Sequence, residues 1–272
     1  MLQITDKEFE IFRVLIKQKM GINLSSEKKS LVFSRLRPLI TQLGLKSFSE
    51  YYEVLIKDKN TEITKSFMDR ISTNHTFFMR ESSHFDYLKT KVLPQIEKMH
   101  SNTKDIRLWC AGCSSGEEAY TLQILLQEYF EDKGGWNLEI LATDISNNVL
   151  NKAYKGVYPK ESIEDLPNPW RLKYFTKHTE FDIAAKPILK NNITFSRFNF
   201  IEDEFRFKKL FQVIFCRNVM IYFDGPTRNA LIKKFYSVTE NGGYLFIGQS
   251  ESIGHADSEY KYVLPAIYTK QI

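Results

Sequence analysis

Residues 106–120 constrain the fold more than any other stretch of this chain. The segment reads Ile-Arg-Leu-Trp-Cys-Ala-Gly-Cys-Ser-Ser-Gly-Glu-Glu-Ala-Tyr: an apolar strand, a turn of small residues and the start of a helix. This order predicts the ligand-binding corner of a doubly wound α/β sheet. The dinucleotide fingerprint G-x-G-x-x-G is absent, because the turn carries only Gly112 and Gly116.

Two carboxylates at the start of this helix indicate the charge of the ligand that can bind there. A dinucleotide site places its pyrophosphate on a helix N-terminus, where free N–H groups and the helix dipole favour an anion. Glu117 and Glu118 occupy that first turn and would repel a phosphate. They favour a cation, and S-adenosylmethionine carries an ammonium and a sulfonium but no phosphate. In a second interpretation the two side chains only complement the helix dipole.

Size and composition restrict the class of protein. A chain of 272 residues, 43% of them hydrophobic, can bury a full core in one large or two modest domains. No apolar run approaches the roughly 18–20 residues of a membrane span, and no signal peptide opens the sequence. Three cysteines make no disulfide framework, so we expect a cytoplasmic protein without membrane insertion. The lone pair Cys110-x-x-Cys113 lacks a second pair of ligands, and we expect no metal.

Residues 1–75 are predicted to form an N-terminal helical domain. Thr5 or Asp6 caps a first helix that ends at Gly21, and a second helix follows. Pro38 falls within the apolar stripe of the second helix and predicts a kink or an early break. Two further helices with apolar stripes complete the domain.

The second helix and its flanks are basic. Between Gly21 and Lys46 a single acid, Glu27, stands against five basic residues: Lys28, Lys29, Arg35, Arg37 and Lys46. This local charge of +4 is nearly the whole net charge of +5. It is either a solvated helix face or a docking surface for an acidic macromolecule, which would be nucleic acid or an acidic protein helix.

The segment 72–80 joins the two parts of the chain. It combines polar capping residues with Phe77, Phe78 and Arg80, and two aromatic side chains make it more hydrophobic than a solvent-exposed linker usually is. We therefore expect it to fold back onto a site. His75 is interpreted as a polar residue there rather than a catalytic base.

Alternating strands and helices follow the first turn. A helix at 115–130 leads to a strand at 138–143, which ends in Asp144 and precedes a helix at 146–154. This order predicts a mostly parallel sheet with its ligand at the carboxyl ends of the strands. Asp144 would lie beside the first turn, where a carboxylate can accept hydrogen bonds from both ribose hydroxyls.

The alternation lapses at 158–192, which is rich in proline and charge. We predict a small inserted antiparallel β subdomain there, with extended pieces at 181–183 and 188–189. The main sheet then resumes, with strands at 193–198, 211–216 and 244–248 and a closing hairpin.

Three segments together resemble one family, the chemotaxis receptor methyltransferases or CheR family. They are Asn-His-Thr-Phe-Phe-Met-Arg at 74–80, the turn at 110–120, and Phe-Cys-Arg-Asn-Val-Met-Ile-Tyr-Phe at 215–223. The resemblance covers nearly the whole chain. It implies a Rossmann-like S-adenosylmethionine-dependent methyltransferase domain at 76–272, which contains the insertion.

Members of this family methylate glutamate side chains on acidic cytoplasmic helices of chemoreceptors, and the resemblance implies this activity, with S-adenosylhomocysteine as product. It places Glu117 at the methionine ammonium, Asp144 at the ribose, and Asn199 with Phe200 at the adenine. The full implied cofactor set is Asn74, Thr76, Arg80, Glu117, Asp144, Asn199, Phe200, Arg217 and Asn218. Receptor docking would use Lys28, Lys29, Arg35 and Arg37, on a protein expected to be a monomer.

A glutamate acceptor has a reference pKa of about 4.3, so at neutral pH it is ionised and needs no catalytic base. Catalysis then consists of removing water and aligning the reacting atoms. We assign Arg80 to orienting a carboxylate of substrate or cofactor, and Tyr222 either to steering the nucleophile or to forming an aromatic wall.

One departure concerns receptor tethering. Family members that bind a receptor's C-terminal pentapeptide carry a G-x-G element in the inserted subdomain. The corresponding loop here is Lys-His-Thr-Glu-Phe at 177–181, which is short and has no glycine. We therefore expect no pentapeptide tether.

Three rival functions are weaker. Amine-directed nucleic-acid methyltransferases usually carry Asn/Asp-Pro-Pro-aromatic after the fourth strand, whereas residues 218–221 contain no proline. A module that binds the cofactor without catalysis would be expected to lack Arg80 or Asn218, and both are present. The acidic helix start disfavours a dehydrogenase.

Overall fold

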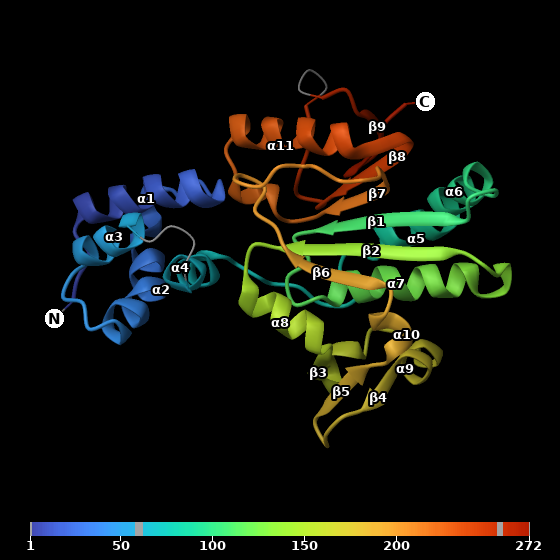
Figure 1. The fold of residues 1–272 in the computed structure, drawn as a ribbon, viewed down its shortest axis with the longest axis horizontal. Coiled ribbons are helices and arrows are strands. Elements are labelled where there is room, and N and C mark those ends of the chain that lie inside the picture. Colours follow the sequence, from blue (N-terminus) through green and yellow to red (C-terminus); the bar gives the residue numbers. More distant parts are fainter. Residues whose placement is uncertain (1, 58–61, 255–257, 272) are drawn as a thin grey trace.

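A seven-stranded sheet forms the centre of the molecule, with helices on both faces, a helical domain at one end and a small second sheet at one side (Figure 1). This computed structural model describes residues 2–57, 62–254 and 258–271. Within the described residues, no helix has the length and hydropathy that crossing a membrane requires.

The N-terminal domain contains the four predicted helices: α1 (Asp6–Met20), α2 (Lys29–Gln42), α3 (Phe48–Lys57) and α4 (Glu62–Ile71), with the short η1 (Ser26–Lys28) before α2. Thr5 forms a capping box with Glu8 at the start of α1, and Gly21 ends it in a left-handed conformation. The break predicted at Pro38 is wrong, because α2 continues to Gln42. Its buried stripe packs into the domain core on both sides of the proline, at Val32, Leu36, Leu39 and Ile40.

After the linker, the chain forms three short consecutive helical segments: α5 (Ser83–Tyr87), η2 (Leu88–Val92) and α6 (Leu93–Met99). The main sheet follows, in the order β6-β2-β1-β7-β8-β10-β9. Its strands are β1 (Asp105–Ala111), β2 (Asn137–Asp144), β6 (Ile193–Arg197), β7 (Phe211–Cys216), β8 (Thr239–Ile247), β9 (Lys261–Leu264) and β10 (Ile267–Thr269). The five strands from β6 to β8 are parallel, which confirms the predicted sheet, and β9 with β10 forms the closing hairpin.

Helices cover both faces of this sheet (Figure 1). One face packs against α5 to α6, α7 (Glu117–Phe130) and α8 (Asn147–Lys155), and the other against α11 (Gly225–Val238). Trp109 of β1 is fully buried on the α11 side. Six phenylalanine rings surround it with centroids 4.9–6.1 Å away: Phe198, Phe200, Phe205, Phe207, Phe211 and Phe235. Four of these come from the loop after β6, so this aromatic cluster fixes that loop against the sheet.

The inserted segment forms the predicted antiparallel subdomain, with strand order β3-β5-β4. Its elements are β3 (Val157–Pro159), η4 (Lys160–Ile163), α9 (Asn168–Tyr174), β4 (Phe175–Lys177), β5 (Asp182–Ala185) and α10 (Pro187–Lys190). The extended piece predicted at 188–189 lies instead in α10, because Pro187 occupies the first turn of a helix, where proline is favoured.

Candidate active site

A cavity lies at the carboxyl ends of β1, β2 and β7, closed on one side by the linker and the end of α1. Its empty volume is about 890 Å3 with the open mouth included. The lining residues come from both domains: Met20, Ile22, Ser72, Thr73, Asn74, His75, Thr76, Arg80, Gly112, Ser114, Glu118, Asp144, Ile145, Phe198, Asn199, Phe200, Arg217, Asn218, Val219, Tyr222 and Phe223.

The glycine turn after β1 forms the floor of this cavity. Gly112 has φ +90°, and a Cβ there would lie 2.5 Å from Cγ2 of Val219, so only glycine fits. The backbone N–H groups of Gly112 and Cys113 both donate to the carbonyl of Thr143 on β2, at 2.8 Å. These two hydrogen bonds fix the turn to the neighbouring strand. A phosphate-binding turn would leave the same N–H groups free for its ligand.

Asp144 ends β2 and is almost fully buried at the cavity wall. Its carboxylate accepts the backbone N–H of Ser114 and of Ser146, each at 2.9 Å. Burial raises the pKa of Asp144, and these hydrogen bonds act in the opposite direction. A further N–H of the glycine turn is therefore occupied by a carboxylate, which leaves the turn unsuited to a phosphate.

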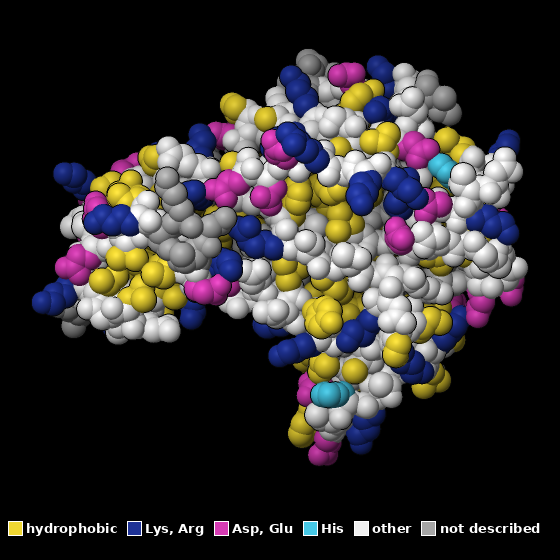
Figure 2. Space-filling model, in the orientation of Figure 1, with side chains coloured by type: hydrophobic (Ala, Val, Ile, Leu, Met, Phe, Trp, Pro, Cys, Tyr) yellow, Lys and Arg dark blue, Asp and Glu magenta, His cyan; other side chains and the backbone are white. Residues whose placement is uncertain are grey.

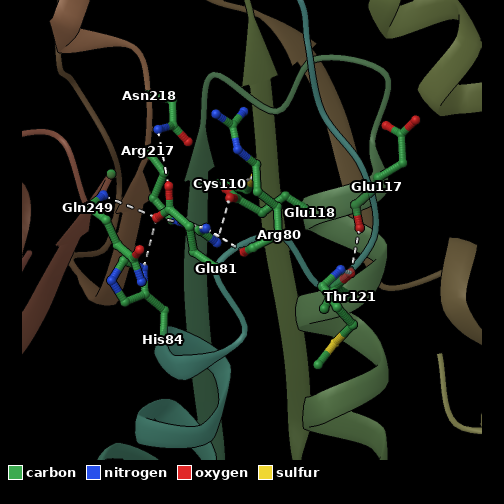
Figure 3. A network of polar contacts seen from close by, with 12 residues as sticks. Arg80, Glu81, His84, Cys110, Glu117, Glu118, Thr121, Arg217, Asn218 and Gln249 are labelled. Atoms are coloured by element: carbon green, nitrogen blue, oxygen red, sulfur yellow. Dashed lines mark hydrogen bonds and ion pairs between the residues drawn. The ribbon is translucent and has the colours of Figure 1, made fainter. Parts of the chain in front are cut away.

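A buried arginine connects three segments at the cavity (Figure 3). Arg217 follows β7, and its side chain is 1% exposed. Its guanidinium lies 3.1 Å from the carboxylate of Glu81, which directly follows the linker, and 3.2 Å from that of Glu118 on α7. It also donates to the carbonyl of Arg80 and lies over the ring of Phe85. One cation thus fixes the linker, the end of β7 and the first turn of α7.

The two glutamates at the start of α7 point in different directions. Glu118 lines the cavity, accepts a hydrogen bond from the Cys110 thiol at 3.2 Å, and has its pKa raised by burial although Arg217 opposes the shift. Glu117 is absent from the lining; its carboxylate accepts from the Ser115 hydroxyl and points away from the network in Figure 3. Successive helix residues differ by about 100° in direction, which is why these two neighbours have different surroundings.

The cavity reaches the N-terminal domain through the loop after β7. Tyr222 lines the mouth within the short helix η5 (Met220–Tyr222), and its carbonyl accepts the backbone N–H of Asn23 at 2.8 Å. An antiparallel bridge joins Ile22 to Phe223. Asn199, predicted at the adenine, donates through its side chain to the carbonyl of Lys19 at 2.8 Å. The helical domain is thus part of the cavity wall.

Nine of the ten residues predicted for cofactor binding or catalysis line this one cavity: Asn74, Thr76, Arg80, Asp144, Asn199, Phe200, Arg217, Asn218 and Tyr222. Glu117 is the exception, and its neighbour Glu118 takes the place on the wall. Sequence reasoning missed Met20 and Ile22, for which the chain offers no local pattern.

The four predicted docking residues lie outside the cavity and differ in their surroundings. Lys28 and Arg37 are exposed. Lys29 pairs with Asp6 at 2.6 Å. Arg35 is partly buried and donates to the carbonyl of Ile71 and to the hydroxyl of Thr73. The guanidinium of Arg35 therefore ties α2 to the linker, in addition to any contact it makes with a partner.

His84 lies directly below the charged network, 2% exposed, with its Nδ1 3.6 Å from the Glu81 carboxylate. Burial, together with the positive charge of Arg217, lowers the pKa of His84 to about 4 from 6.5, while Glu81 opposes the shift. Burial alone would raise the pKa of Glu81, but Arg217 and hydrogen bonds from Asn218 and Gln249 lower it. At neutral pH the imidazole is uncharged beside a paired Arg217 and Glu81.

This lowered pKa predicts a pH dependence of stability. Between pH 6.5 and pH 4 the unfolded chain binds a proton at His84 that the folded chain does not, so the free energy of unfolding falls as pH falls. The expected contribution over this window is about 3 kcal/mol. Urea unfolding at several pH values should show a shallower fall for His84→Gln than for wild type. His178→Gln, at an exposed histidine, should keep the wild-type slope, and equal slopes for all three proteins would contradict the assignment.

The donor set fits S-adenosylmethionine better than a nucleotide phosphate. Two carboxylates, the partly buried Glu118 and the buried Asp144, face the cavity, and no lysine lines it among the described residues. The two arginines present are Arg80 and Arg217, and Arg217 is neutralised by two carboxylates. A cationic, phosphate-free ligand therefore meets two carboxylates here, and Arg80 is the arginine available to a carboxylate of the ligand.

Comparison with known proteins agrees with this geometry. Residues 74–267 match the family described as CheR methyltransferase, SAM binding domain, and residues 7–72 match the CheR methyltransferase, all-alpha domain. A chemotaxis protein methyltransferase of Borreliella burgdorferi is 43% identical over 272 residues, covering 99% of this chain and 96% of that protein. Chemotaxis protein methyltransferase 1 of Pseudomonas aeruginosa is 32% identical, covering 96% of each chain. The chemotaxis protein methyltransferase of Escherichia coli is 30% identical, covering 95% of this chain and 89% of that one. This chain therefore belongs to the CheR family of S-adenosylmethionine-dependent methyltransferases.

Proposed function

We propose that this protein methylates glutamate side chains on the cytoplasmic helices of chemoreceptors, forming the methyl esters used in chemotactic adaptation. The observation that carries the proposal is the cavity itself. The N–H groups of its glycine turn donate to the Thr143 carbonyl and the Asp144 carboxylate, and the Glu118 and Asp144 carboxylates lie on its wall. The chemotaxis methyltransferases to which the chain is similar support the receptor as substrate.

The residues proposed to hold the cofactor are Asn74, Thr76, Arg80, Asp144, Asn199, Phe200, Arg217 and Asn218, with Glu118 in the place predicted for Glu117. When bound, S-adenosylmethionine supplies an electrophilic methyl group on its sulfonium. Glu118 and Asp144 are the carboxylates available to its ammonium and its ribose. Phe198 and Phe200, fixed by the cluster around Trp109, offer apolar surface for its adenine.

Arg80 and Tyr222 are the groups proposed to act on the reaction. The Arg80 guanidinium donates to the carbonyl of His75 at 2.8 Å, which leaves other N–H groups of its planar fork for a carboxylate. Tyr222 lines the cavity mouth. An ionised glutamate needs only alignment and removal of water, and alignment can supply about 7–11 kcal/mol of the barrier.

Labelled methyl transfer to a receptor cytoplasmic fragment tests this proposal. We expect a base-labile product from the wild type, since base hydrolyses a carboxyl ester. Arg80→Ala should lower kcat/KM about 100-fold and Tyr222→Phe about tenfold, because each removes a group that aligns the acceptor. The matched controls Arg70→Ala and Tyr154→Phe change exposed residues and should keep wild-type rates. Full turnover by both folded site variants would exclude the two assignments, and a base-stable product would exclude a glutamate acceptor.

Receptor docking is proposed to use the basic surface of η1 and α2, chiefly the exposed residues Lys28 at the end of η1 and Arg37 of α2. The methylated helices of receptors are acidic, so basic side chains accelerate encounter and set register. Lys29 and Arg35 already have partners in Asp6 and the linker, so they hold the surface in place as well as contributing charge.

Reversing the charges of Lys28 and Arg37 should weaken receptor docking and leave cofactor binding unaffected. We expect Lys28→Glu with Arg37→Glu to raise KM for the receptor fragment about tenfold at low salt, with cofactor affinity unchanged. The difference should shrink as salt rises, because screening acts on exposed charges. Lys91→Glu with Lys98→Glu makes the same charge change on the η2–α6 surface and should leave KM unaltered. An equal rise in KM for both pairs would show a general charge effect instead of a docking site.

We further propose a cytoplasmic monomer that does not act on nucleic acid, divided at about residue 75 with the subdomain at 158–192. Figure 2 shows Lys and Arg side chains interspersed with Asp and Glu over one face of the molecule. This mixture offers no continuous basic track for a phosphate backbone on that face.

Pentapeptide tethering is not part of the proposal. The loop between β4 and β5 closes on itself, with the Thr179 hydroxyl accepting the N–H groups of Phe181 at 3.2 Å and Asp182 at 2.9 Å. Calorimetry with a receptor's free C-terminal pentapeptide should therefore detect no tight binding. Removal of the pentapeptide from a receptor should leave its methylation rate unchanged, and tight capture would refute this view.

A further inference from the structure

Asn218 has an unusual conformation for a residue of the cavity wall. It follows β7 directly and has φ +57°, in the left-handed region that residues other than glycine seldom adopt, although asparagine does so more often than most. Such conformations persist only where the surroundings over-determine them, and they concentrate at functional sites. The hydrogen bonds and packing around Asn218 therefore account for its conformation.

A buried carboxylate from a distant part of the chain fixes the backbone here. Glu251 lies just after β8 and is 8% exposed. Its Oε2 accepts the N–H of Asn218 at 2.9 Å and that of Gly248, and its Oε1 accepts the N–H of Ile221 at 2.9 Å. No ion pair within 4 Å reaches Glu251 in the described ranges. Backbone N–H groups alone stabilise this carboxylate, as they would a bound anion.

A second carboxylate holds the side chain of Asn218 from the opposite direction. Glu81 accepts the Asn218 Nδ2–H at 3.2 Å through Oε1 and the backbone N–H of Gln249 at 3.1 Å through Oε2 (Figure 3). Glu81 is also the carboxylate paired with Arg217. Asn218 thus lies between the linker and the segment after β8.

The packing around this pair leaves no room for an extra atom. A Cβ on Gly248 would lie 2.5 Å from Nδ2 of Asn218 and 2.9 Å from Oε2 of Glu251. Gly248 has no positive φ, so its backbone tolerates alanine and only the space excludes a side chain. Gly248 therefore gives an independent way to displace Asn218 without removing a charge.

We propose that Glu251 is a positioning residue for methyl transfer, whose carboxylate sets Asn218 and the turn carrying Tyr222 at the mouth of the cofactor cavity. Glu251 is absent from the cavity lining and acts through the N–H groups of Asn218 and Ile221. The kinetic part of this inference rests on the proposed function, while the part that concerns cofactor affinity does not.

Two variants test it, assayed by calorimetric binding of S-adenosylhomocysteine and by kcat with a receptor fragment. Glu251→Gln turns one acceptor oxygen into an N–H donor that faces backbone donors, and Gly248→Ala forces Asn218 away. Each should weaken S-adenosylhomocysteine binding about tenfold and lower kcat about 10- to 100-fold. KM for the receptor should stay within about twofold, because α2 lies on the other domain.

Matched controls separate positioning from simple loss of stability. Glu128→Gln removes a carboxylate with three side-chain donors on α7 away from the cavity, and Gly225→Ala adds a Cβ with no atom within 4 Å. Both should keep wild-type affinity and kcat, whatever their thermal midpoints.

If Glu251→Gln folds, its affinity for S-adenosylhomocysteine and its kcat test the proposal. If it does not fold, the same measurements on Gly248→Ala test the proposal. The proposal would be overturned if that variant had a lowered thermal midpoint but bound S-adenosylhomocysteine and turned over within twofold of wild type. Glu251 would then be a purely structural residue. If the wild type failed to methylate a receptor, the proposed acceptor would be wrong, and the binding measurements would still decide the role of Glu251.

Discussion

The structure depends on one buried cation held between two carboxylates. Arg217 extends from the end of β7 between Glu81, which directly follows the linker, and Glu118 of α7, and it also donates to the carbonyl of Arg80 in the linker. Loss of one member of such a buried set costs about 3–5 kcal/mol, because an unpaired charge stays behind in a low-dielectric site. The linker, the sheet and the first helix of the methyltransferase domain are therefore held in one arrangement, and the cavity wall consists of the residues between these three segments.

The same arrangement brings the helical domain into the site. Met20 and Ile22 line the cavity, Asn23 donates to Tyr222, and Arg35 ties α2 to Thr73 of the linker. The surface proposed to dock the receptor and the wall proposed to hold the cofactor are thus connected by short hydrogen bonds. Arg35 therefore contacts the segment that carries Asn74 and Thr76, which lies between the surface proposed for docking and the cavity.

Charge is used in two distinct ways in this molecule. Around the cavity, carboxylates are buried and satisfied by backbone N–H groups, as at Asp144 and Glu251, or by Arg217. On η1 and α2, the cations Lys28 and Arg37 remain in solvent. Buried charges of the first kind fix geometry at a desolvation cost, whereas exposed ones contribute little energy and mainly guide association.

Local chemistry was enough to predict the framework. The capping box at Thr5, the left-handed Gly21, the strand–turn–helix at 106–120 and the carboxylate after the second strand all follow from near neighbours in the chain. The sequence by itself therefore determined the helical domain, the parallel sheet and the place of Asp144 beside the glycine turn, while the resemblance to a known family supplied most of the other predicted residues of the cavity wall. Tertiary structure decided the rest: that Glu118 faces the cavity, that Arg35 holds the linker, and that Glu251 reaches Asn218 across 33 positions. These contacts depend on helix rotation and on segments distant in sequence, and no local pattern of residues encodes either.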